Sequence, residues 1–271
     1  MTWAQKFSEW LVEEKEENIT TTDGKPIKVF SFNYNSTDDE TMSDWAKHFR
    51  NHYCPDNKID ILRSGTGLSK KDYLLNRKFP DQTVAPGPSV RSGDFSEILI
   101  ADYFEFLLDY WIPRTRYSNK SNKNSSTMGS DIIGLRFFDK NETEKDTIAV
   151  IESKASFKSK RNGLQEAINH SVKDEKRLAE SLNAMKQRYI ETNNIENAKK
   201  VERFENPTDK PYTMFYGAAA LFSNETYNEE EIKTSDASKH VDSHHLMLIV
   251  IKGDNMMNLV NELYRRAADE A

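Results

Sequence analysis

The stretch Thr147-Ile148-Ala149-Val150-Ile151-Glu152-Ser153-Lys154 decides the fold of this chain. Its first five residues are mostly β-branched, and such a continuous run is typical of a central strand buried on both faces. Two charged residues follow at the end of the run. Because side chains two apart on a strand share a face, we expect Glu152 and Lys154 to point one way and Ser153 the other.

A second carboxylate precedes this strand. Asp131 stands at the head of another apolar run, and carboxylates from neighbouring strands supply the oxygen ligands that Mg²⁺ prefers. An acid two residues before a lysine also occurs elsewhere, as at Asp23 and Lys25, but there it follows no β-branched run. The pattern therefore predicts a metal-dependent phosphodiesterase site. The alternatives are a solvated ion pair of Glu152 with Lys154 and a turn cap at Asp131.

The charge is unevenly distributed. The 271 residues are 30% charged with a formal net charge of −6, which indicates a soluble chain that does not bind polyanions over its whole surface. Between residues 112 and 162, however, eleven Lys or Arg stand against six acids. We expect Lys158, Lys160 and Arg161 to bind the phosphates of a nucleic acid, with a charged surface loop as the alternative.

The single cysteine, Cys54, excludes an intrachain disulfide and a cysteine-rich zinc cluster, and a cytoplasmic location fits it. Residues 1–17 have an amphipathic helical pattern without the core of a signal peptide. No apolar stretch reaches the roughly 18 residues that a membrane span requires. We therefore expect no membrane segment.

The order of predicted elements indicates an α/β fold. Helices are expected at 1–17, 41–53, 94–110, 162–204 with a break near 192–194, and 255–267; strands at 27–34, 59–62, 114–117, 131–138, 147–157, 212–222 and 245–252. Residues 64–92 are rich in Gly, Pro and Ser and are predicted to form a linker or long loop. The chain thus divides into an N-terminal α/β region, 1–90, and a core, 91–271, with a mixed central sheet flanked by helices.

Gly129-Ser130-Asp131, then Glu152-Ser153-Lys154, after a helix that carries Glu97, resemble the PD-(D/E)xK nuclease superfamily and its restriction-endonuclease-like core. Ser130 stands where the family name has proline. The resemblance implies that Glu97, Asp131 and Glu152 hold Mg²⁺ or Mn²⁺, and that Lys154 contacts the scissile phosphate or the attacking water. Asp94 is the alternative to Glu97, although it could instead cap its helix.

The same resemblance concerns Gln165, which lies in the helix after the proposed catalytic strand. Many relatives carry a glutamine or a basic residue there that faces the site. A solvent-facing surface glutamine is the alternative.

A narrower similarity covers most of the chain. Residues 93–99, 129–134 and 151–155 are similar to the HamA family, the nuclease subunit of the Hachiman anti-phage defence system. This resemblance implies a bacterial DNA-degrading effector that works with a HamB-like helicase and ATPase. The chain has no Walker-type motif, so ATP use would belong to that partner, and residues 1–90 are candidates for docking it. A non-catalytic subunit that binds DNA or the helicase, and an RNase, are the alternatives.

Two histidine pairs have the i,i+4 spacing of zinc ligands, His48 with His52 and His240 with His244. Neither pair has the glutamate of a His-Glu-x-x-His motif, and no third ligand is evident in the sequence near either. We therefore predict that neither pair binds zinc.

Overall fold

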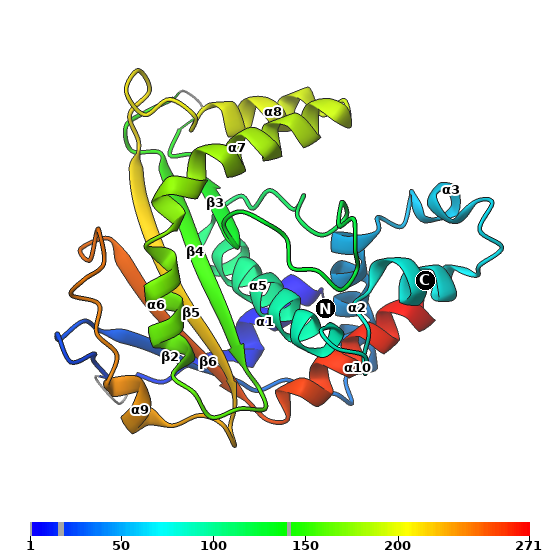
Figure 1. Ribbon diagram of the computed structural model, residues 1–271, viewed down its shortest axis with the longest axis horizontal. Coiled ribbons are helices and arrows are strands. Elements are labelled where there is room, and N and C mark those ends of the chain that lie inside the picture. The colour runs from blue at the N-terminus through cyan, green and yellow to red at the C-terminus, as the bar shows by residue number, and fades with distance from the viewer. Residues whose placement is uncertain (1, 16–18, 140–141) are drawn as a thin grey trace.

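A computed structural model describes residues 2–15, 19–139 and 142–271. Its centre is a six-stranded sheet in the order β1-β2-β6-β5-β4-β3, with helices on both faces (Figure 1). Strands β2, β6, β5 and β4 run parallel, and the two edge strands β1 and β3 are antiparallel to their neighbours. The strands are β1 Leu11–Glu13, β2 Ile27–Phe32, β3 Ile132–Arg136, β4 Thr147–Ser156, β5 Thr213–Ser223 and β6 Leu246–Gly253. The predicted α/β fold with a mixed sheet is confirmed.

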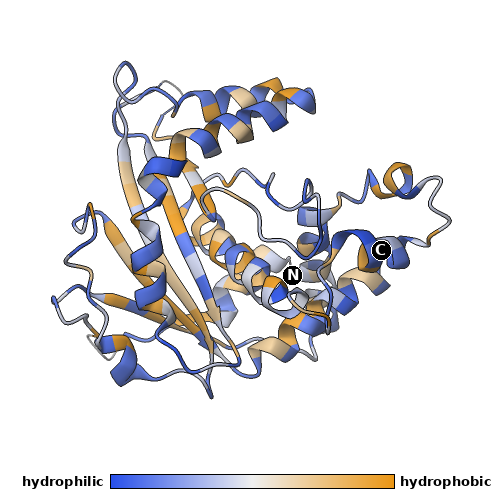
Figure 2. Cartoon of the chain, in the orientation of Figure 1, coloured by the Kyte–Doolittle hydropathy of each residue, from blue (hydrophilic) through white to orange (hydrophobic). Residues whose placement is uncertain are grey.

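The helices form two layers. One face of the sheet shares a core with α1 Trp3–Trp10, α2 Asp39–Tyr53, α5 Gly87–Leu108 and α10 Met256–Asp269. The other face is covered by α6 Gly163–Ser171, α7 Asp174–Glu191, α8 Ile195–Glu202 and α9 Glu229–Lys233. Figure 2 shows mostly hydrophobic strands behind an α6 that presents hydrophilic residues outward. Burial on both faces explains the continuous apolar runs of β4, β5 and β6.

The alternation of side chains along β4 assigns its residues to the two layers. Ala149 and Ile151 belong to the core under α5, whereas Ile148 and Val150 pack with residues of α7 and α8. Successive side chains on a strand point to opposite faces, so Glu152 and Lys154 lie on the α6–α7 side. The strand therefore presents its charged residues to one helical layer only.

The two predicted regions share one sheet and one core. β1 and β2 come from residues 1–90, and β2 pairs with β6 over six residues of each strand. Trp3, Trp45 and Phe49 pack in the same core as Ile98 and Leu99 of α5. A docking role for residues 1–90 stays a prediction, but this region also completes the sheet.

Several predicted elements differ from the structure. Residues 59–62 form helix α3, Ile59–Arg63, because only Ile59 is buried and Ile61 is 79% exposed, which a half-buried strand would not give. Residues 114–117 join no strand ladder in the described chain, since their arginines turn toward buried acids. The predicted loop 64–92 contains helix α4, Lys70–Tyr73, the π-helix η1, Leu74–Lys78, and the start of α5.

The helix boundaries also shift. α5 begins at Gly87, with Pro88 in its first turn, where a missing backbone N–H costs nothing. α1 ends at Trp10 and is followed by β1, so a helix through residue 15 is wrong, while Met1 and residues 16–17 lie outside the described residues. The break near 192–194 is confirmed, and a second break at 172–173 separates α6 from α7. No described helix is both long and apolar enough to cross a membrane.

Candidate active site

The pairing of β3 with β4 brings two of the predicted acids together. Ile132 pairs with Ile151, so Asp131, the residue before β3, stands opposite Glu152. The carboxylate of Asp131 accepts a hydrogen bond of 3.1 Å from the backbone N–H of Ser153. This bond ties the start of β3 to the charged end of β4.

The side chains of β4 divide between the two faces as the alternation predicts. The ammonium of Lys154 donates to Oε1 of Glu152 on the α6–α7 side. The hydroxyl of Ser153 lies 2.5 Å from the hydroxyl of Ser96 on α5, on the opposite side of the sheet. Glu152 and Lys154 therefore form an ion pair on one face, largely removed from solvent.

Glu97 reaches the site through an arginine. Arg116 Nε lies 2.9 Å from Glu97 Oε2, an ion pair without hydrogen-bond alignment, and Arg116 Nη2 donates to Asp131 Oδ1 at 3.0 Å. The Tyr117 hydroxyl also donates to Glu97 at 2.7 Å. Arg116 thus joins the acid of α5 to the acid before β3.

The structure gives Asp94 hydrogen-bond partners that differ from those of Glu97. Asp94 lies within α5, which begins at Gly87, so its alternative role as a helix cap is wrong. Its buried carboxylate accepts hydrogen bonds from the Tyr53 hydroxyl and the Lys120 ammonium, at 2.6 and 2.5 Å. Glu97 is the acid of α5 that shares a partner with Asp131.

Two residues of the site were not predicted. His170, on α6, holds Nδ1 3.4 Å from Oε1 of Glu152. Asp174, at the start of α7, is fully buried, and neither carboxylate oxygen has a well-formed hydrogen bond to another described residue. The i,i+4 spacing of His170 and Asp174 was the only indication in the sequence that the two side chains could lie together. The sequence predicted one helix over this segment, whereas the structure has a break between α6 and α7.

Burial perturbs the acids of the site. It raises the pKa of Glu97 to about 8, with Arg116 acting in the opposite direction and Asp131 adding to the shift. Burial and the Asp131 charge raise the pKa of Glu152 to about 7, and burial raises the pKa of Asp174 to about 6. The cause common to these shifts is the loss of hydration on burial, which Arg116 and Lys154 offset only in part.

We call Glu97, Asp131, Glu152 and Asp174 the acid cluster. Two cations, Arg116 and Lys154, pair with its members, so full ionisation of the four acids leaves two negative charges. A divalent cation would balance this excess, and carboxylate oxygens are the ligands that Mg²⁺ and Mn²⁺ accept. The buried carboxylate of Asp174, which has the Ser130 hydroxyl as its polar neighbour, and the raised pKa values fit such an ion. The residues present are thus chemically suited to a hard metal.

The acid cluster is not compact as it stands. Among the described residues, the one trio of possible metal ligands within 4.8 Å of one another consists of His48, His52 and Asp102. In the acid cluster, the guanidinium of Arg116 lies between Glu97 and Asp131.

The predicted nucleic-acid residues lie beyond the end of β4. Lys158 and Lys160 are exposed, whereas Arg161 donates to the carbonyl of Ala155 at 2.8 Å and pairs with a glutamate of α6. The Gln165 amide donates to Asn169 and to the carbonyl of residue 236, so in this structure it is bound away from the acids. Of these four residues, Lys158 and Lys160 are the two whose side chains have no hydrogen-bond or ion-pair partner in the described chain.

These features define a class of protein. A mixed sheet with helices on both faces, carrying acids and a lysine on two adjacent strands, is an α/β protein with a nuclease-like core. The family model HamA matches residues 5–267, and the chain belongs to the HamA family. It is thus an anti-phage defence protein of the Hachiman type. No curated protein matches the chain.

Proposed function

We propose that this chain is a metal-dependent DNA endonuclease, the effector of its defence system, which acts in the cytoplasm under the control of a HamB-like helicase. The observation that carries the proposal is the placement of Asp131 opposite Glu152, with Lys154 on the same face. Membership of the HamA family supports the defence role. The raised pKa of Glu152 supports a cation at this position.

Asp131, Glu152 and Glu97 would hold Mg²⁺ or Mn²⁺, with the carbonyl of Ser153 as a further ligand. When bound, the metal supplies a Lewis acid that lowers the pKa of a water and offsets charge on the phosphate. Lys154 contributes a compact ammonium beside the scissile phosphate. His170 is exposed next to Glu152 and can exchange protons with solvent from that position.

DNA would lie along the end of β4. Lys158 and Lys160 are free to contact backbone phosphates, and Arg161 and Gln165 would do so after leaving their present partners. Phosphate contacts of this kind carry no sequence information and weaken as salt rises.

The helicase would dock on residues 1–90. In Figure 1, α3 lies at the end of the molecule away from the sheet, and its Ile61 and Leu62 are 79% and 41% exposed. Because β2 pairs with β6, a deletion of residues 1–90 would break the sheet, so substitutions test the surface better. Ile61→Asp with Leu62→Asp should abolish co-purification with the helicase, and Ile190→Asp on α7 is the control. Full retention of the helicase would exclude this helix as the docking surface.

Plasmid cleavage by the purified chain tests the nuclease. We would measure it in Mg²⁺, Mn²⁺ or EDTA, with and without the helicase and ATP, beside Glu152→Ala/Lys154→Ala. The matched control is Glu231→Ala/Lys233→Ala, the same residue pattern on helix α9, which carries none of the proposed site residues. We expect metal-dependent cleavage that falls by at least about a hundredfold in the first variant only, the order expected when charge-stabilising groups are removed.

The outcomes separate the alternatives. Equal cleavage by both double variants would contradict the proposed site. Binding of DNA or helicase without cleavage in any condition would favour a non-catalytic subunit. Cleavage of RNA alone would identify an RNase on the same metal chemistry.

A further inference from the structure

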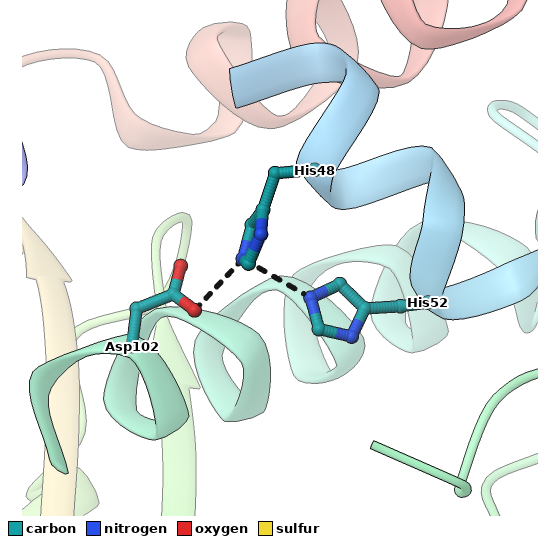
Figure 3. Close-up of side chains that lie close together, drawn as sticks. All are labelled: His48, His52 and Asp102. Atoms are coloured by element: carbon teal, nitrogen blue, oxygen red, sulfur yellow. Dashed lines mark hydrogen bonds and ion pairs between the residues drawn. The ribbon is translucent and has the colours of Figure 1, made fainter. Parts of the chain in front are cut away.

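We propose that His48, His52 and Asp102 form a second metal site, selective for Zn²⁺ or a similar borderline transition metal and distinct from the acid cluster. We call these residues the histidine cluster. It does not depend on the proposed nuclease activity. Figure 3 shows the two imidazoles of α2 and the carboxylate of α5 converging from facing helices.

The three ligand atoms lie within 4.8 Å of one another. His48 Nε2 lies 3.2 Å from His52 Nε2 and 2.9 Å from Asp102 Oδ1. Bonds of about 2.0 Å to tetrahedral zinc place its ligands about 3.3 Å apart. The sequence prediction that no third ligand accompanies this histidine pair is therefore wrong, because Asp102 is 50 or more positions away along the chain and is brought in by the packing of α5 on α2.

The protonation pattern also suits a metal. One proton on His48 Nε2 can be shared between Asp102 and His52, which leaves His52 Nε2 as an acceptor. Burial and the neighbouring Arg114 lower the pKa of His52 well below its ordinary value, so this imidazole is neutral, as a ligand must be. Zinc binding would require His48 to carry its proton on Nδ1, so that Nε2 is free to act as a ligand.

Second contacts hold the ligands in place. The indole N–H of Trp3 donates to the other oxygen of Asp102 at 3.0 Å. Such outer partners commonly fix the orientation of ligating carboxylates. His48 is 27% exposed at its side chain and lines a cavity of about 540 Å³, which gives the ion a route and leaves a fourth position for water.

Arg114 occupies part of this position in the structure. Its Nη1 lies 3.3 Å from His52 Nε2, and its Nη2 donates to Asp102 Oδ1 at 2.6 Å. The guanidinium also binds Glu105, where Nε donates at 3.0 Å. Arg114 can thus leave the histidine cluster and still keep a carboxylate partner, so a metal can enter without leaving an unpaired buried cation.

The histidines at positions 240, 244 and 245, which lie outside the histidine cluster, provide a control. His240 Nε2 contacts the Ser171 hydroxyl at 3.1 Å, and His245 is paired with Asp242, so these histidines lie with hydrogen-bonding side chains and form no compact ligand group. His244 is exposed. Replacing His244 and His245 removes two imidazoles without touching α2.

The test uses full-length protein from which EDTA has removed bound metal. The protein is titrated with Co²⁺ in the presence of excess Mg²⁺, so that Mg²⁺ and not Co²⁺ occupies the acid cluster. Visible absorption reports Co²⁺ bound by imidazoles, and Zn²⁺ is then added as competitor. We expect one Co²⁺ per chain, displaced by Zn²⁺, with the signal lost in His48→Gln/His52→Gln. It should be unchanged in His244→Gln/His245→Gln and in Asp131→Asn/Glu152→Gln.

A second variant keeps the test decisive if His48→Gln/His52→Gln does not fold. In His48→Cys the ligand set survives with sulfur in place of nitrogen, so a thiolate-to-cobalt absorption band should appear. The absence of Co²⁺ binding in the wild type, a signal that persists in a folded His48→Gln/His52→Gln, or loss of the signal in Asp131→Asn/Glu152→Gln would each overturn the second site.

Discussion

The acid cluster and the histidine cluster share one helix, since Glu97 and Asp102 lie on α5, yet their chemistry differs. Both meet an arginine from the same short segment, Arg116 at the acids and Arg114 at the histidines. The acid cluster offers only oxygen, and burial raises the pKa of its glutamates. The histidine cluster offers imidazole nitrogen beside one carboxylate. The scaffold is common to both, and the donor atoms decide which cation each can take.

The two arginines also differ in which carboxylates would lose a partner if the arginine were removed. Arg116 is the cation shared by Glu97 and Asp131, both of which are largely buried. Asp102 retains the Trp3 indole and His48 if Arg114 departs. The acid cluster therefore depends more strongly on its arginine, unless a metal replaces it.

The largest effect on stability is expected from Arg116→Met. Removing one partner of a buried ion pair costs about 3 kcal/mol or more, so the free energy of unfolding should fall by roughly that amount in EDTA. Mg²⁺ should restore a part of it. The measurement is urea unfolding at pH 7, with Arg63→Met, which breaks a solvent-exposed pair with Asp60, as the control. Equal losses in the two variants would contradict a stabilising role for Arg116.

The pH dependence of stability should have opposite signs at the two clusters. Glu152 titrates near 4.5 when unfolded and its pKa is about 7 when folded, so its contribution is complete below 4.5 and is lost as pH rises toward 7. For Glu97 the loss extends toward its folded pKa of about 8. His52 has a lowered pKa, so its contribution is complete above its ordinary 6.5 and declines as pH falls.

Urea unfolding between pH 5 and pH 8.5 in EDTA measures these slopes. Glu97→Gln/Glu152→Gln should reduce the decline of stability at rising pH and leave the part that Asp174 contributes, and His52→Gln should reduce the decline at falling pH. Wild-type slopes in both variants would show that neither cluster is coupled to folding through its protons.

The smallest effect is expected outside both clusters. Lys158→Ala/Lys160→Ala should weaken DNA binding a few-fold and reduce the slope of log affinity against log salt by about 2, because each lysine accounts for about one phosphate contact. Lys28→Ala/Lys58→Ala removes the same charge from exposed positions elsewhere and is the control. Fluorescence anisotropy with labelled duplex DNA gives both quantities. An identical loss in the two variants would indicate only a net-charge effect.

The sequence was informative where a local rule determines the structure. The β-branched run before Glu152 predicted a central strand, and the two-residue period placed Lys154 on the face of Glu152, as the structure has it. Asp131 was identified because it heads the preceding apolar run. These inferences need only the alternation of side chains and the burial of parallel strands.

Other features depend on contacts between distant segments. Asp102 joins His48 only when α5 packs on α2, and nothing in the spacing of the two histidines indicates that acid. Arg116 lies in a stretch that alternates like a strand, but its charge is satisfied by Glu97 and Asp131 instead of solvent. Secondary-structure propensity and hydrophobic periodicity describe single helices or strands. They therefore do not predict which charged residues pair across the tertiary structure.

The most direct test of the difference between the clusters is a measurement of Mn²⁺ binding by electron paramagnetic resonance. Mn²⁺ is a hard cation, and its unpaired electrons make it observable by this method. Wild type, Asp131→Asn/Glu152→Gln and His48→Gln/His52→Gln would be titrated with Zn²⁺ present to fill the histidine cluster. We predict that Mn²⁺ binding is lost in the acid variant and kept in the histidine variant. Retention of full Mn²⁺ binding by Asp131→Asn/Glu152→Gln would contradict a metal site at the acid cluster.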